Sequence, residues 1–191
     1  MNIRCRENLA IEIHHHPHYQ SLNEKLMTDF SRLYFYRHEE NLNYTNIKGS
    51  QLNFCKDNHS LKPKGVSLIE NWVKQIIQSK LSVSTQLYFS TWAARLDRGQ
   101  ETLDHDHLFY ATCAFVYFVN APKGASPLIF TTSGKKIKAE PGKLVIFPAS
   151  LRFNCLTMFP LLSIIALIPL LADLTKNVLF SIALKIDLAK C

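Results

Sequence analysis

A chain of 191 residues with 47% hydrophobic and 19% charged residues has the size and composition of one globular domain, which excludes a disordered chain and argues against two full domains. The formal net charge of +7 comes from scattered Lys and Arg, so no nucleic-acid site is indicated. Five cysteines without a close pair argue against a disulfide framework, and the amino terminus lacks the long hydrophobic region of a signal peptide. We therefore expect a cytoplasmic protein.

The first half of the chain predicts two helices. Residues 9–13 are compatible with an opening strand, and the histidines at 14–18 then alternate in direction around Pro17, which argues against a shared metal site. Ser21 and Ser67 each precede a Glu by three residues, a capping-box pattern that predicts a helix start. The apolar faces of these helices are Leu22, Leu26, Phe30 and Leu33 in the first, and Leu68, Trp72, Val73, Ile76, Ile77 and Leu81 in the second. The polar segment between them is expected to be a loop with a short strand near 51–54.

The second half predicts strands. From Val83 the apolar period changes to two, with Leu87, Phe89 and Thr91 on one face and Trp92 on the other. Further strands are expected over 109–119, 127–130 and 143–148, where apolar runs are bounded by turn residues. Helices first and several short strands afterwards are typical of an α+β domain.

The triplet His105-Asp106-His107 carries the chemistry that this sequence indicates. If the segment is extended, His105 and His107 point to the same face of one strand, and two imidazoles so placed can share a metal ion. Asp106 should then face away and orient or screen the site rather than ligate. From the residues alone, the favoured interpretation is that the histidines are polar residues at a sheet edge.

The order of these motifs resembles the Fe(II)/2-oxoglutarate-dependent oxygenases of the kind found in phages and marine bacteria. The resemblance covers residues 1–150 and is carried by the segments Ser90–Ala93, Gly99, His105–His107, Phe115–Val119, Pro127–Phe130 and Pro141–Ala149, with Tyr44–Gly49 and Trp72 upstream. It implies one domain over 1–191 with a double-stranded β-helix core, a jelly-roll or cupin-like fold, and amino-terminal helices packed on the sheet. It also implies an oxidoreductase that hydroxylates an unknown small-molecule or protein substrate.

The same resemblance implies a site that this chain does not complete. His105 and His107 would bind Fe(II), and Tyr117 is a candidate to contact the co-substrate 2-oxoglutarate. The third ligand should be a histidine near Phe153–Asn154, followed about ten residues later by an arginine for the distal carboxylate, yet no histidine follows His107. Arg152 is too early for that arginine. The alternative is therefore a non-catalytic jelly-roll binding or structural protein that has lost the chemistry.

Residues 151–191 form an atypical apolar tail. The span 155–172 is uncharged, which leaves three interpretations open: buried strands or a covering helix, a membrane segment interrupted by Pro160 and Pro169, or a frameshift product. In a shifted frame, the codons of Thr157 and Met158 can spell His, and those of Ile165 and Ala166 can spell Arg. A frameshifted tail is expected to pack poorly.

Overall fold

The computed structural model describes residues 10–37, 47–54, 62–81, 87–156 and 161–168, and the structural statements below refer to these residues. They form helices and antiparallel strands, which agrees with the predicted α+β class. The helices are α1 (Tyr19–Ser31) and α2 (Lys64–Leu81), and the strands are β1 (Glu12–His15), β2 (Tyr36–Arg37), β3 (Ile47–Lys48), β4 (Ser50–Asn53), β5 (Ser90–Leu96), β6 (Glu101–His105), β7 (Cys113–Asn120), β8 (Leu128–Phe130), β9 (Lys135–Ile137), β10 (Lys143–Pro148), β11 (Phe153–Leu156) and β12 (Leu161–Ile168).

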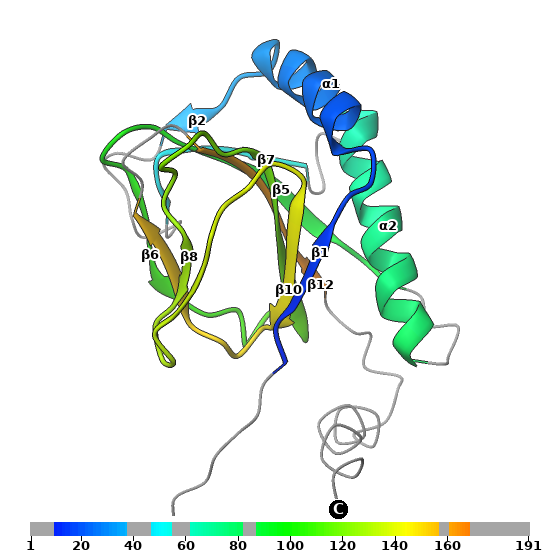
Figure 1. Cartoon of the computed structure of the whole chain (residues 1–191), viewed down its shortest axis with the longest axis vertical. Helices are drawn as coiled ribbons and strands as arrows, with labels where there is room; N and C mark the ends of the chain where they lie inside the picture. Colours follow the sequence, from blue (N-terminus) through cyan, green and yellow to red (C-terminus); the bar gives the residue numbers. More distant parts are fainter. Residues whose placement is uncertain (1–9, 38–46, 55–61, 82–86, 157–160, 169–191) are drawn as a thin grey trace, which may run out of the picture.

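The strands make two sheets that face each other. One sheet has seven strands in the order β1-β10-β7-β12-β5-β4-β2, and the other has five in the order β3-β6-β11-β8-β9. Figure 1 shows α1 and α2 together on the outer side of the seven-stranded sheet, so the helices pack on the sheet as the sequence predicted. The side chains therefore bury in two layers, one between the sheets and one beneath the helices.

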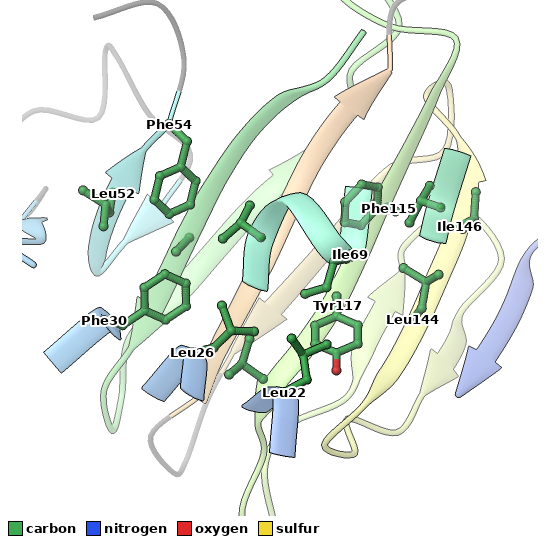
Figure 2. Close-up of a cluster of buried hydrophobic side chains, with 14 of the residues drawn as sticks. Leu22, Leu26, Phe30, Leu52, Phe54, Ile69, Phe115, Tyr117, Leu144 and Ile146 are labelled. Carbon is green, nitrogen blue, oxygen red and sulfur yellow. The ribbon is translucent and has the colours of Figure 1, made fainter. Parts of the chain in front are cut away.

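Strand β7 contributes to both layers because its side chains alternate. Val116 and Phe118 pack between the sheets with Phe130 and Phe147. Phe115 and Tyr117 point to the opposite side, where they pack with leucines of α1 and with Ile69 of α2 (Figure 2). Both faces of β7 are therefore apolar, and a residue's position in the sequence decides which layer it joins.

Strand β5 alternates in the same way, which confirms the predicted period of two. Thr91 lies beneath the helices, where its hydroxyl donates a hydrogen bond of 2.5 Å to Oε1 of the buried Glu70 on α2. The ammonium group of Lys62 also lies 2.5 Å from that carboxylate. Trp92, the next residue of β5, packs against the layer between the sheets. These contacts hold α2 to β5 and direct Trp92 inward.

Both helices begin earlier than their capping boxes predict. Helix α1 begins at Tyr19, and the Ser21 hydroxyl donates to the carbonyl of His18 instead of capping. Helix α2 begins at Lys64, three residues before Ser67. Its first turn lies against α1 so closely that a Cβ on Gly65 would be 2.7 Å from Leu26 Cδ2. Packing of the two helices therefore overrides the local capping pattern.

Two strands begin later than predicted. Strand β5 begins at Ser90, while residues 82–86 of the predicted strand lie outside the described residues. Strand β7 begins at Cys113 rather than at Phe109, and Phe109 and Tyr110 are exposed in the preceding turn. Backbone amides of Tyr110 and Ala111 donate to the carbonyl of His107, so this turn is fixed by the residue that the sequence marks as a ligand.

The tail supplies strands to both sheets up to residue 168. Strand β11 lies between β6 and β8 in the smaller sheet, and β12 lies between β7 and β5 in the larger one. Ser163 in β12 is buried. The tail is therefore strand over 153–156 and 161–168, and its backbone pairs with both sheets there. Neither α1 nor α2 is long and apolar enough to cross a membrane.

Candidate metal site between the two sheets

The two histidines of the central motif lie side by side. Strand β6 ends at His105, and His107 follows two residues later, with the ring centroids 4.8 Å apart. The backbone amide of His107 donates a 2.8 Å hydrogen bond to the carbonyl of Ala149, just beyond β10. The structure thus brings together the two residues that the sequence predicted as metal ligands, and it fixes the second to the end of the opposite sheet.

Each ring has one nitrogen suited to bind a metal ion. Nδ1 of His105 lies 2.6 Å from the carbonyl oxygen of Leu103. Because a carbonyl only accepts, Nδ1 must carry the proton, which leaves the lone pair of the neutral ring on Nε2. Nε2 of His107 is buried and has no hydrogen-bond partner among the described residues. A buried polar atom without a partner requires an explanation, and a bound ion or water supplies one.

Burial favours the neutral form of both imidazoles. It is the main cause that lowers the pKa of His107 to about 4, and the nearby His105 lowers this pKa further while Asp106 opposes the shift. Burial also lowers the pKa of His105, against the hydrogen bond to Leu103 and the charge of Asp104, which raise it. Metal ligation requires neutral imidazole, so these shifts favour a metal ion over a proton at this place.

The acidic residues of the motif point outward. Arg152 lies 2.9 Å from Asp104 Oδ2 and 3.4 Å from Asp106 Oδ2, and all three side chains are partly exposed. A hydrogen bond from Thr131 and the pair with Arg152 lower the pKa of the Asp104 carboxyl. Asp106 also accepts a hydrogen bond from the backbone of Leu108. Asp106 and Arg152 are therefore engaged with each other on the outer face, and the orienting role expected for Asp106 stays a prediction.

Phe153 lies where the third ligand was expected. It is paired with His105 across strands β11 and β6, and its ring centroid is 4.4 Å from that of His105 and 5.6 Å from that of His107. Its side chain is 2% exposed and also packs on Phe147 at 5.1 Å. A side chain with no donor atom therefore stands beside both imidazoles.

Trp92 lines the same space from the other sheet. Its ring centroid is 6.0 Å from that of His107, and its Nε1 is a second buried atom without a hydrogen-bond partner among the described residues. Two ring nitrogens without a hydrogen-bond partner thus lie on adjacent rings. The period of two placed Trp92 on the face of the strand opposite to Thr91, but it gave no sign that the indole adjoins the histidines.

Tyr117 does not lie at this site, contrary to the prediction. Its ring is buried beneath the helices (Figure 2), whereas Trp92 and Phe153, which adjoin the histidines, pack in the layer between the sheets. Its hydroxyl donates a 2.8 Å hydrogen bond to Asn23 Oδ1, and Asn23 in turn donates to the carbonyl of Val119 at 2.7 Å. Tyr117 therefore joins α1 to β7, and the assigned contact to 2-oxoglutarate does not agree with this geometry.

The described residues do not complete an iron site. Two imidazole nitrogens are suitable ligands, but no group of three or more His, Cys, Asp or Glu that could hold a metal ion occurs in the described ranges. The amino-terminal histidines form no such group either: His14 pairs with Glu12, and His16 packs edge-on against Trp72 at 4.9 Å. The three ligands that the resemblance implies are therefore not found among the described residues.

Comparison with known proteins gives fold neighbours only. No protein-family model and no curated protein matches the chain. Among solved structures, a viral collagen prolyl hydroxylase from Paramecium Bursaria Chlorella virus-1, as a 2OG complex, has a TM-score of 0.60 and 15% identity over 83% of this chain and 94% of that chain. A prolyl-4-hydroxylase from Pseudomonas putida has a TM-score of 0.62 and 14% identity over 83% of this chain and 91% of its own.

A third neighbour is a prolyl hydroxylase from Trichoplax adhaerens, in complex with a hypoxia inducible factor peptide fragment. Its TM-score is 0.64, with 11% identity over 83% of this chain and 82% of that chain. At these identities the likeness shows the fold: the chain shares the fold of prolyl hydroxylases and 2OG-Fe(II) oxygenases.

Proposed function

We propose that this chain is an Fe(II)/2-oxoglutarate-dependent oxygenase-type protein with a double-stranded β-helix core, in which His105 and His107 bind the metal ion. One observation carries the proposal: the two rings lie 4.8 Å apart, the tautomer of His105 leaves its Nε2 free to ligate, and Nε2 of His107 is buried without a partner. The fold neighbours support the class of protein. The resemblance to the phage and marine-bacterial type and the cytoplasmic location belong to the same proposal.

The chemistry that Fe(II) and 2-oxoglutarate supply in such proteins is the activation of dioxygen to hydroxylate a carbon of a small-molecule or protein substrate. The part assigned to this chain is narrower. His105 and His107 present two neutral nitrogens, and Leu103 and Ala149 hold the two residues in place through backbone groups. Two nitrogens beside Phe153 do not make the full ligand set, and the nearby Arg152 is paired with Asp104 and Asp106.

The test is metal uptake followed by turnover. The purified full-length chain is incubated with Fe(II) without air, desalted and analysed for iron, and succinate formation from 2-oxoglutarate is then measured under air. We expect iron in excess of that in a double variant, His105→Ala with His107→Ala. Equal iron content in both proteins would contradict the proposed metal site, and iron without succinate would contradict the oxygenase activity of this chain.

A second candidate function is favoured by Phe153. A phenyl ring lies next to both histidines, and no histidine or arginine follows Phe153 in the sequence. A non-catalytic relative would show this combination. In that case the fold serves a binding or structural role. Succinate formation above that of the double variant would exclude this candidate.

For the tail we propose divergence within an unbroken reading frame. Strand β12 pairs with β5 from Leu161 to Leu167 and with β7 from Leu162 to Ile168, so it occupies the centre of the larger sheet. A segment read in a wrong frame has no selection for such pairing. This pairing supports divergence over a frameshift for residues 161–168, and residues 157–160 and 169–191 lie outside the described residues.

A further inference from the structure

We infer that Phe153 occupies the third-ligand position of this site, so that the chain offers a metal ion two imidazole nitrogens and an aromatic wall on the remaining side. The inference rests on the proposed function of the histidine pair. It adds that one side chain separates the present chain from a three-ligand site.

The sheet leaves few other places for a third ligand. A third donor must come from a side chain that lies beside both rings, and the aromatic rings beside His107 among the described residues are those of His105, Trp92 and Phe153. No group of three His, Cys, Asp or Glu that could hold a metal ion occurs in the part of the chain that the structure describes. Trp92 lies at 6.0 Å, and its indole nitrogen carries a proton and cannot ligate. Phe153 alone is in ring contact with both histidines and stands on a strand paired directly with β6.

The nearby polar groups do not substitute for it. The carboxylates of Asp104 and Asp106 are held on the outer face by Arg152. The thiol of Cys155 is buried in the layer between the sheets, and Cys155 pairs with Thr102 of β6, whereas Phe153 pairs with His105.

The phenyl ring also has a structural role that a ligand would not fill as well. Phe153 packs on Phe147 at 5.1 Å, and Phe147 packs on Phe130 at 5.0 Å, which makes an aromatic row between the sheets. An imidazole in place of Phe153 is smaller and polar, so it fits the space but weakens this row. The substitution Phe153→His should therefore add a metal ligand and at the same time lower the stability of the metal-free protein.

The experiment compares Phe153→His with Phe130→His in the full-length chain. Phe130 is a matched control because it is 1% exposed, pairs with Phe153 across β8 and β11, and packs on Phe147, while its ring has no contact with either histidine among the described rings. Cobalt(II) is titrated into each purified protein at neutral pH, with the visible absorption of the bound ion and calorimetry as readouts. The double variant His105→Ala with His107→Ala gives the background from the other histidines.

We expect Phe153→His to bind cobalt(II) at least about tenfold more tightly than the unchanged chain, the lower end of what even an outer-shell partner contributes to metal affinity. Phe130→His should bind like the unchanged chain, and both variants should unfold at lower denaturant concentration without metal. If Phe153→His does not fold alone, cobalt(II) should restore its folding and should not restore that of Phe130→His. Equal affinity in folded Phe153→His and the unchanged chain, or no rescue, would overturn the inference.

These outcomes separate the inference from the proposed function. If the unchanged chain binds no more cobalt(II) than the double variant while Phe153→His does, the inference about position 153 stands. The metal site proposed for the unchanged chain is then refuted. If the unchanged chain binds cobalt(II) through its histidines and Phe153→His gains nothing, only the inference fails. If neither protein exceeds the background, both fail.

Discussion

Phe153 and His105 face each other across strands β11 and β6, with ring centroids 4.4 Å apart. This pairing fixes what the fold can offer a metal ion. The sheet places the two histidines side by side, whereas the strand next to them presents a phenyl ring. The fold can therefore bring the histidines together in a chain that offers no third ligand beside them among its described residues, because the pairing of strands does not depend on the side chain at this position.

Replacing His105 or His107 by Ala should abolish specific metal binding and leave the fold nearly unchanged. Loss of one of two ligands should lower cobalt(II) affinity at least about 100-fold, since loss of an outer-shell partner alone costs roughly 10- to 100-fold. Each variant is titrated with cobalt(II), and its secondary structure is followed by far-ultraviolet circular dichroism. His18→Ala, an exposed histidine outside the site, is the control and should bind like the unchanged chain. Loss of the fold in the site variants would assign these histidines a structural role.

The stability of the metal-free protein should fall as the pH is lowered from about 6.5 to 4. The pKa of His107 is about 4 when folded and 6.5 for an ordinary histidine, so between these values the unfolded chain binds more protons. Unfolding then takes up a proton, and at most about 3 kcal/mol of stability is lost through this window. Urea unfolding at several pH values measures the slope. His107→Gln should flatten it, and an unchanged slope in that variant would refute the assignment to His107.

Tyr117→Phe should destabilise the protein without changing metal affinity. The variant leaves Oδ1 of Asn23 without its buried donor, which costs about 1 to 3 kcal/mol. Urea unfolding gives the free energy, and cobalt(II) titration gives the affinity. Tyr110→Phe is a suitable control because Tyr110 is 73% exposed, so it should change stability by less than about 0.5 kcal/mol. A weaker cobalt(II) affinity in Tyr117→Phe would show that Tyr117 contributes to the metal site.

The sequence could predict the elements of this fold better than their ends and faces. The period of two in β5 placed Thr91 and Trp92 on opposite faces correctly, because one of them needs the Glu70 carboxylate and the other an apolar layer. In β7 both faces are apolar, so no pattern could tell that Tyr117 looks toward the helices and Val116 toward the other sheet. The misassignment of Tyr117 follows from that symmetry.

The site was predictable where it is local in sequence. His105 and His107 are two residues apart, so their proximity needs only a nearly extended chain. The contact of Phe153 with them depends on the register between β11 and β6, which shifts between Phe153 and Cys155. Motif order placed the missing ligand near residue 153, but only the pairing of strands shows that the phenyl ring stands beside both imidazoles.

The nucleotide sequence tests the origin of the tail. For a hidden frame to encode the absent histidine and arginine, Thr157 must be encoded by ACC and Ile165 by ATC, and that frame must remain open. We expect at least one of these conditions to fail, because strand β12 pairs with β7 and β5 over its whole length, and such pairing is improbable for a segment that was never selected in this frame. Sequencing of the gene gives both codons directly.

If both codons match and the frame is open, the frame-restored protein should be made and assayed for succinate from 2-oxoglutarate. Succinate formation by that protein, with none from the present chain, would show that the tail is a frameshift product and would overturn divergence as its origin.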